Sequence, residues 1–191
     1  MSLQKINTRT IVLISMMLVA SIMRLISYEF PYTLSLFTPL AAIALFGGAY
    51  FTDKWKAYLV VLITLFLSDI FINYLYTSKL VLWYSGAIWV YLPFLAMVFI
   101  GSFIKKVSPG SVAIAALVSV AAHWLLSDLP WMYGTMYPHS FSGYIQSLTA
   151  AIPFEKNLLM ANVVFCSVLF GGFEFAKRKY TILRSQRELA V

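Results

Sequence analysis

Charged residues in this 191-residue chain are confined to short clusters that separate long apolar runs. Only 14 residues are Lys or Arg and 7 are Asp or Glu, whereas 61% of the chain is hydrophobic. A run of about 18 or more apolar residues can cross the hydrocarbon core of a bilayer. The pattern excludes a soluble globular domain and predicts an integral membrane protein.

Six apolar runs approach the length of a membrane span. Lipid offers no hydrogen-bond partners to the backbone, so each run is expected to form a helix. None alternates polar and apolar residues as the strands of a β-barrel do. The expected spans are residues 10–26, 36–51, 57–73, 80–104, 112–129 and 158–176. We therefore predict an all-α bundle of six transmembrane helices in one domain, residues 1–176, followed by a basic cytoplasmic tail, residues 177–191.

The distribution of Lys and Arg predicts the orientation. With a cytoplasmic N-terminus, the inner segments carry eleven of these residues and the outer segments only Arg24, Lys79 and Lys156. Cytoplasmic loops are enriched in Lys and Arg, so both termini are expected inside. The net charge of +7 is then mainly a consequence of topology, and nucleic acid is not an expected partner. An N-terminal signal peptide is the alternative for the first run, and its removal would leave five helices.

Ionisable residues within membrane spans are rare and usually functional. Here they gather toward the outer ends of the expected helices, together with aromatic residues. Such a group suits an outward-facing pocket for a small amphipathic molecule. The predicted substrate-binding residues are Arg24, Tyr28, Asp69, Trp83, Tyr84, His123, Asp128, Trp131 and Asn162. Structural alternatives remain open: an interfacial aromatic belt, helix packing by His123, and aspartates that cap helices or pair with Arg24.

Two short sequences recur along the chain. Leu-Phe-Gly-Gly occurs at residues 45–48 and 169–172, and Leu-Ser-Asp occurs at 67–69 and 126–128. Internal repeats are common in transporters, although chance similarity of helix ends explains such short matches equally well. Small residues allow helices to approach closely in lipid. The predicted packing or coupling residues are Ala44, Gly47, Gly48, Gly171 and Gly172.

The segment 130–157 is the longest expected connection between spans. Its apolar residues between 140 and 152 fall on one helical face, which predicts an amphipathic helix lying along the membrane. A lid over the pocket is the functional alternative for this helix.

Motifs of nucleotide-dependent and zinc enzymes are absent from the sequence. Cys166 is the single cysteine, so no intrachain disulfide can form, and two histidines with one cysteine do not make an ordinary zinc site. We expect no metal, no cofactor and no enzymatic activity. Acid–base chemistry by Asp69, Asp128 and His123 remains the catalytic alternative.

Several segments carry a family resemblance: Phe37-Thr38-Pro39-Leu40-Ala41, residues 45–51, Leu67-Ser68-Asp69 and residues 170–174. They resemble a family of small uncharacterised bacterial six-helix membrane proteins and, more loosely, the S components of energy-coupling-factor vitamin transporters, cobalamin-type proteins included. The resemblance implies a multi-pass protein of the bacterial inner membrane that binds a vitamin near the outer face. It also implies an energising transmembrane and ATPase module as partner.

The chain departs from the S-component pattern in two places. An Ala-X-X-X-Ala pattern is missing from the first span, and Cys166 lies too deep to ligate a corrinoid cobalt near the outer face. We therefore expect a membrane subunit for uptake of a vitamin or related micronutrient, a corrinoid being one option. A scaffold protein of the cell-shape type and an intramembrane enzyme are the alternatives.

Overall fold

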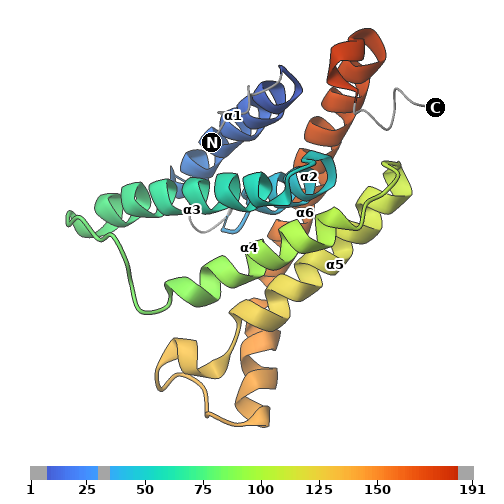
Figure 1. Ribbon diagram of the computed structural model, residues 1–191. Coiled ribbons are helices and arrows are strands. Elements are labelled where there is room, and N and C mark those ends of the chain that lie inside the picture. Colours follow the sequence, from blue (N-terminus) through green and yellow to red (C-terminus); the bar gives the residue numbers. More distant parts are fainter. Residues whose placement is uncertain (1–7, 30–34, 185–191) are drawn as a thin grey trace.

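The computed structural model describes residues 8–29 and 35–184, with side chains described for 8–24 and 35–184. All regular secondary structure in this part of the chain is helical, as predicted (Figure 1). The α-helices are α1 (Thr8–Glu29), α2 (Leu40–Tyr50), α3 (Lys54–Thr77), α4 (Ala87–Ser102), α5 (Pro109–Ser127) and α6 (Phe141–Lys179). Two short 3₁₀ helices follow α5 and α6: η1 (Pro130–Tyr133) and η2 (Thr181–Leu183).

Three of these helices, α3, α5 and α6, are long and apolar enough to cross a membrane. Large apolar side chains cover their outer faces, for example Leu67, Ile114 and Val168, each about 60% exposed. A protein in water rarely presents so much contiguous apolar surface. The helices therefore have the lengths and surfaces of a membrane protein.

Helices α2 and α4 are shorter than the predicted spans. Helix α2 has 11 residues, and at about 1.5 Å per residue it covers only about half of a bilayer core. Helix α4 begins at Ala87 rather than at residue 80, because Ser78 ends α3 in the left-handed conformation and residues 78–86 form a connection. A left-handed residue is a common way to stop a helix.

Helix α6 corrects the prediction for the segment before the last span. Residues 141–179 form one continuous helix, so the separate helix expected along the membrane between 140 and 152 is wrong. Pro153 lies inside α6 without ending it. Proline is tolerated in membrane helices when neighbouring groups satisfy the freed carbonyl. The helix is about 58 Å long, roughly twice the thickness of a bilayer core, and runs the length of the molecule (Figure 1).

Helix α2 lies at the centre of the bundle. It contacts α1, α3, α4, α5 and α6, and ten of its 11 residues are buried. A helix that is apolar on every side must be covered on every side. Phe46 packs edge-on against Phe170 and Phe173 of α6, with ring centroids 5.4 and 5.7 Å apart. These aromatic contacts fix α6 against the central helix.

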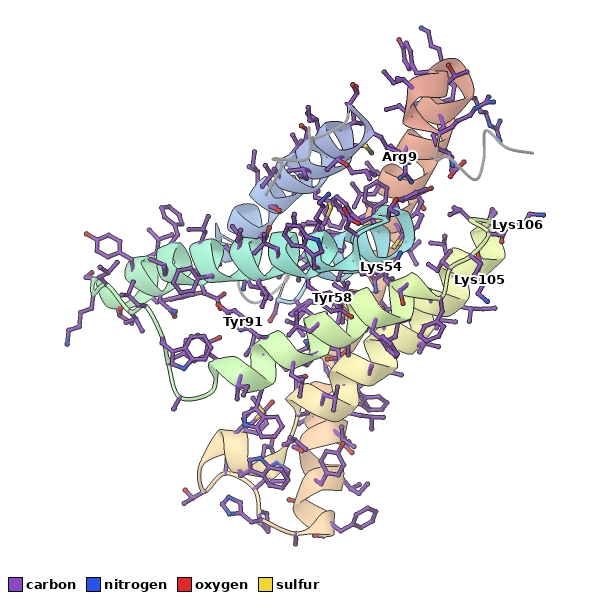
Figure 2. The ribbon with its side chains drawn as sticks, viewed as in Figure 1. Arg9, Lys54, Tyr58, Tyr91, Lys105 and Lys106 are labelled. Atoms are coloured by element: carbon purple, nitrogen blue, oxygen red, sulfur yellow. The ribbon has the colours of Figure 1, made fainter. Side chains whose placement is uncertain are left out.

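Basic side chains gather toward one end of the bundle. Figure 2 shows Arg9, Lys54, Lys105 and Lys106 on the right-hand side of the view, the side on which α6 ends. The first residues of the expected tail belong to the folded part of the chain. Lys177 is a buried residue of α6, and the short helix η2, which contains the buried Leu183, contacts α1. Residues 185–191 of the tail lie outside the described residues.

The start of α5 carries a capping box. The Ser108 hydroxyl accepts a hydrogen bond from the Ser111 amide at 3.2 Å, and the Ser111 hydroxyl accepts one from the Ser108 amide at 3.0 Å. We predict that Ser108→Ala lowers the free energy of unfolding by about 1 kcal/mol, because the Ser111 amide at the helix start loses its side-chain acceptor. Equilibrium unfolding in mixed detergent micelles measures the change. Ser102→Ala, at the exposed end of α4, is the control; an equal loss there would contradict the capping argument.

Candidate functional site

The first polar cluster joins α1 to α3. Arg24 Nη2 forms an ion pair of 2.6 Å with Asp69 Oδ1, and its Nη1 donates to the Ser68 hydroxyl. Both charged side chains are nearly buried, with 13% and 10% of their surface exposed. Tyr84, in the connection before α4, donates to the other oxygen of Asp69 at 3.4 Å. The two residues are thus bound to each other, which matches the structural alternative in which an aspartate pairs with Arg24.

The second cluster joins α5, η1 and α6. His123 Nδ1 lies 2.6 Å from Glu155 Oε1, and both side chains are buried. Ser127 lies between His123 and Asp128, within 3.2 Å and 3.3 Å of them. Tyr133 of η1 donates to Asp128 Oδ1 at 2.7 Å. Asp128 is also the residue that follows α5, so its position matches the helix-capping alternative.

Glu155 is the member of this cluster that sequence reasoning missed. The sequence pattern puts Glu155 in the expected connection 130–157, where a carboxylate calls for no explanation, but in the structure α6 holds it in the protein interior. Its Oε2 atom is buried and has no hydrogen-bond partner among the described residues. The helical period holds a usable signal, because Glu155, Leu158 and Asn162 lie three to seven residues apart on one buried face.

The two clusters have no residue in common. The first cluster is built from α1, α3 and the connection before α4. Helix α4 also touches the second cluster, because the ring of Phe94 packs against His123 with centroids 5.6 Å apart. Arg24, Asp69 and His123 lie in the second halves of α1, α3 and α5. Glu155 lies in the first half of α6, and Tyr84 precedes the start of α4. The structure thus assembles the predicted polar residues as two groups at one end of the bundle.

Two phenols in these clusters stay protonated near neutral pH. Burial, reinforced by the Asp69 carboxylate, raises the pKa of Tyr84. Burial and the hydrogen bond to Asp128 likewise raise the pKa of Tyr133. Each hydroxyl therefore acts as a hydrogen-bond donor to its carboxylate and not as an acid.

Three more of the predicted binding residues have described side chains: Trp83, Trp131 and Asn162. Trp83 and Trp131 are 60% and 53% exposed, and Trp83 contacts the ring of Tyr91 at a centroid distance of 5.6 Å. The side chain of Tyr28 lies outside the described residues. Asn162 is fully buried between α5 and α6, where it donates to the Ser119 hydroxyl at 3.1 Å.

The predicted packing residues divide into close and open positions. A Cβ added at Gly48 would lie 2.2 Å from the Val98 carbonyl oxygen of α4, and one at Gly47 would lie 3.0 Å from Met17 Cε of α1. Ala44 is fully buried in the same helix. A Cβ at Gly171 would meet nothing within 4 Å, and one at Gly172 would make only an ordinary contact with a side chain of α1. Close packing between the described helices is therefore a property of the first Gly-Gly pair, and the packing or coupling role of Gly171 stays a prediction.

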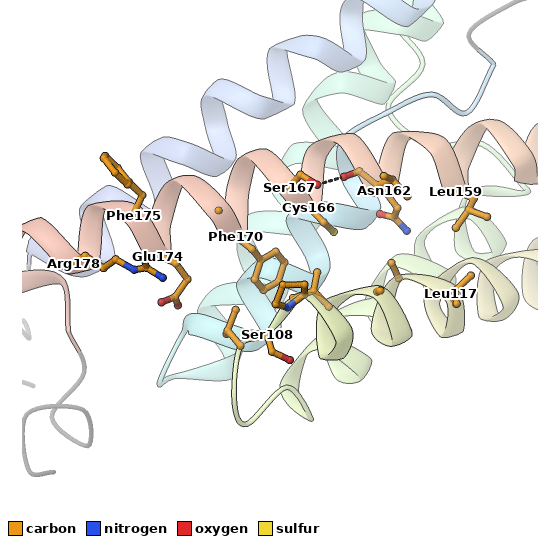
Figure 3. Close-up of a pocket in the computed structure, with 17 residues that line it drawn as sticks. Ser108, Leu117, Leu159, Asn162, Cys166, Ser167, Phe170, Glu174, Phe175 and Arg178 are labelled. Atoms are coloured by element: carbon orange, nitrogen blue, oxygen red, sulfur yellow. Dashed lines mark hydrogen bonds between the residues drawn. The ribbon is translucent and has the colours of Figure 1, made fainter.

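A groove of about 790 Å³ runs between α5 and α6. Figure 3 shows Asn162, Phe170 and Glu174 of α6 lining it opposite Leu117 and Ser108 at the α5 side. Its walls are mainly apolar. The Oδ1 atom of Asn162 is buried without a hydrogen-bond partner among the described residues. Among the predicted binding residues with described side chains, Asn162 alone lines this groove.

Metal-binding geometry is absent from residues 8–24 and 35–184: no three His, Cys, Asp or Glu side chains come together there in a way that could hold an ion. Cys166 is a free, buried cysteine of α6 that lines the groove between α5 and α6.

The sequence was also compared with known proteins. The model of a family of unknown function (DUF6580) matches residues 4–186. No curated protein and no solved structure matches the chain.

Proposed function

We propose that this chain, which belongs to the family of unknown function DUF6580, is a multi-pass subunit of the bacterial inner membrane that captures a small molecule from outside the cell. In this proposal all six α-helices form the membrane domain, and both termini are cytoplasmic. The clustering of Arg9, Lys54, Lys105 and Lys106 at one end of the bundle supports this orientation (Figure 2).

The partnerless carboxylate oxygen of Glu155 is the observation that carries the proposal. A buried carboxylate is costly unless each oxygen is hydrogen-bonded, and a buried atom without a partner calls for an explanation. A bound molecule that donates a hydrogen bond would supply the missing partner. His123 contacts the other oxygen of the same carboxylate, and Ser127 links His123 to Asp128, which accepts from Tyr133. These groups would orient that molecule.

The class of molecule follows from the setting. Aromatic side chains and a few ionisable groups at one end of a membrane bundle suit a small amphipathic compound. A vitamin or related micronutrient fits this description and agrees with the resemblance to S components of energy-coupling-factor transporters. The chain would bind its substrate without transforming it, and a separate membrane and ATPase module would drive uptake.

Ligand retention tests the proposal. We predict that protein purified in detergent from its natural membrane carries a small-molecule adduct in native mass spectrometry. Glu155→Gln and Asp128→Asn should each reduce adduct occupancy at least about tenfold, since a lost charge-assisted hydrogen bond costs about 1.5–3 kcal/mol. A panel of water-soluble vitamins that includes cobalamin, added to the stripped protein, identifies the compound by thermal stabilisation.

Glu174→Gln is the matched control, because Glu174 is a carboxylate of the same helix at the opposite end. It should leave the adduct unchanged. The proposal fails if wild-type protein carries no adduct and none of the vitamins stabilises it. It also fails if both cluster variants retain the adduct like wild type while eluting as folded protein.

A further inference from the structure

The groove between α5 and α6 lies away from both polar clusters and differs from them in chemistry. Apart from Asn162 its middle is lined by apolar or small side chains, such as Val112, Ala116, Val163 and Phe170. Both walls are helices long and apolar enough to cross a membrane. In the proposed membrane domain, a groove between two such helices would be open to lipid.

The dimensions of the groove limit what it can hold. On α6 it extends from Leu159 to Arg178, which corresponds to about 28 Å at the helical rise. A volume of about 790 Å³ spread over that length makes the site a long groove rather than a rounded cavity. An extended hydrocarbon chain has this long, apolar shape.

One end of the groove is basic. A second cavity of about 290 Å³, lined by Glu174, Lys177, Arg178 and Arg184, shares Glu174 and Arg178 with the groove. Lys177 neutralises Glu174 in an ion pair of 2.8 Å, and the Tyr50 hydroxyl also donates to this carboxylate. The guanidinium groups of Arg178 and Arg184 therefore leave this end with a net positive charge.

We infer that this groove is a binding site for an anionic phospholipid. One acyl chain lies between α5 and α6, and the phosphate contacts Arg178 and Arg184 at the basic end. Arginine suits this role because its planar fork binds two phosphate oxygens at once. Basic pockets between membrane helices at the cytoplasmic side commonly hold such headgroups. This site is independent of the molecule captured at the opposite end.

Lipid titration of the full-length protein tests the inference. Delipidated protein in detergent is titrated with dioleoylphosphatidylglycerol and, separately, with dioleoylphosphatidylcholine, and native mass spectrometry measures bound lipid. We expect tighter binding of phosphatidylglycerol. Arg178→Gln and Arg184→Gln should each weaken that binding about fivefold, with little effect on phosphatidylcholine.

A second variant tests the acyl-chain half of the site without changing charge. Gly171→Leu places a side chain in the groove at a position where an added Cβ meets no atom within 4 Å, so folding should be preserved. It should weaken phosphatidylglycerol binding by a similar factor. The double variant Lys105→Gln/Lys106→Gln removes basic residues that do not line the groove and should bind like wild type.

Three results would overturn the inference. Equal binding of the two phospholipids would show that charge is not recognised. An equal loss in the Lys105 and Lys106 variant would indicate general attraction to a basic surface. Oleate that binds as tightly as phosphatidylglycerol would assign the groove to free fatty acids.

Discussion

Gly48→Ala should lower the free energy of unfolding by about 3 kcal/mol or more, at or above the upper end of usual overpacking costs. The added Cβ would lie 2.2 Å from the Val98 carbonyl oxygen and 3.0 Å from the backbone of Gly101. Both obstacles are backbone atoms of α4, so no side chain can rotate away. The central helix α2 must then separate from α4, which disturbs a core that α2 shares with five other helices. Equilibrium unfolding in mixed micelles, followed by far-ultraviolet circular dichroism, measures the loss.

Gly171→Ala is the matched control, because Gly171 belongs to the second copy of the same four-residue sequence. Its Cβ position is open, and alanine is favoured over glycine in a helix by about 1 kcal/mol. This variant should be as stable as wild type or more so. Gly101→Ala should reproduce the Gly48 effect, since its Cβ would lie 2.4 Å from the Leu45 carbonyl oxygen. Wild-type stability of Gly48→Ala would contradict the close crossing of α2 and α4.

Arg24→Met should destabilise the protein by about 3–5 kcal/mol, the usual cost of removing one partner of a buried ion pair. Asp69 would keep the hydrogen bond of 3.4 Å from Tyr84 but would lose the cation of its ion pair inside an apolar bundle. The double variant Arg24→Met/Asp69→Leu should recover most of the loss, because no uncompensated charge remains. The same unfolding assay gives the coupling energy of the pair from the single and double variants.

The exposed pair Lys56–Asp53 is the control for that experiment. Its side chains are 25% and 43% exposed, and Lys56→Met should cost less than about 1 kcal/mol. If the Arg24 and Lys56 variants lose the same stability, or if the double variant is less stable than Arg24→Met, the burial argument for the Arg24–Asp69 pair is wrong.

The repeated sequences show how far local pattern reaches. The two Leu-Ser-Asp copies place Asp69 in the middle of α3, bound to Arg24, and Asp128 after the end of α5, bound to Tyr133. Equal sequences thus have unequal environments. The partner of Asp69 is Arg24, 45 residues away in the sequence on another helix. The partner of Asp128 is Tyr133, in the neighbouring 3₁₀ helix η1.

The membrane character and all-helical structure followed from the sequence alone, because hydropathy and the need to satisfy backbone hydrogen bonds in lipid act locally along each run. The tertiary structure decided what depends on contacts between distant segments. It set the burial of α2, the single helix from 141 to 179, and the pairing of His123 with Glu155. A charge-free run reveals that a helix is apolar, but only its packed neighbours determine whether a carboxylate such as Glu155 faces solvent, lipid or a partner.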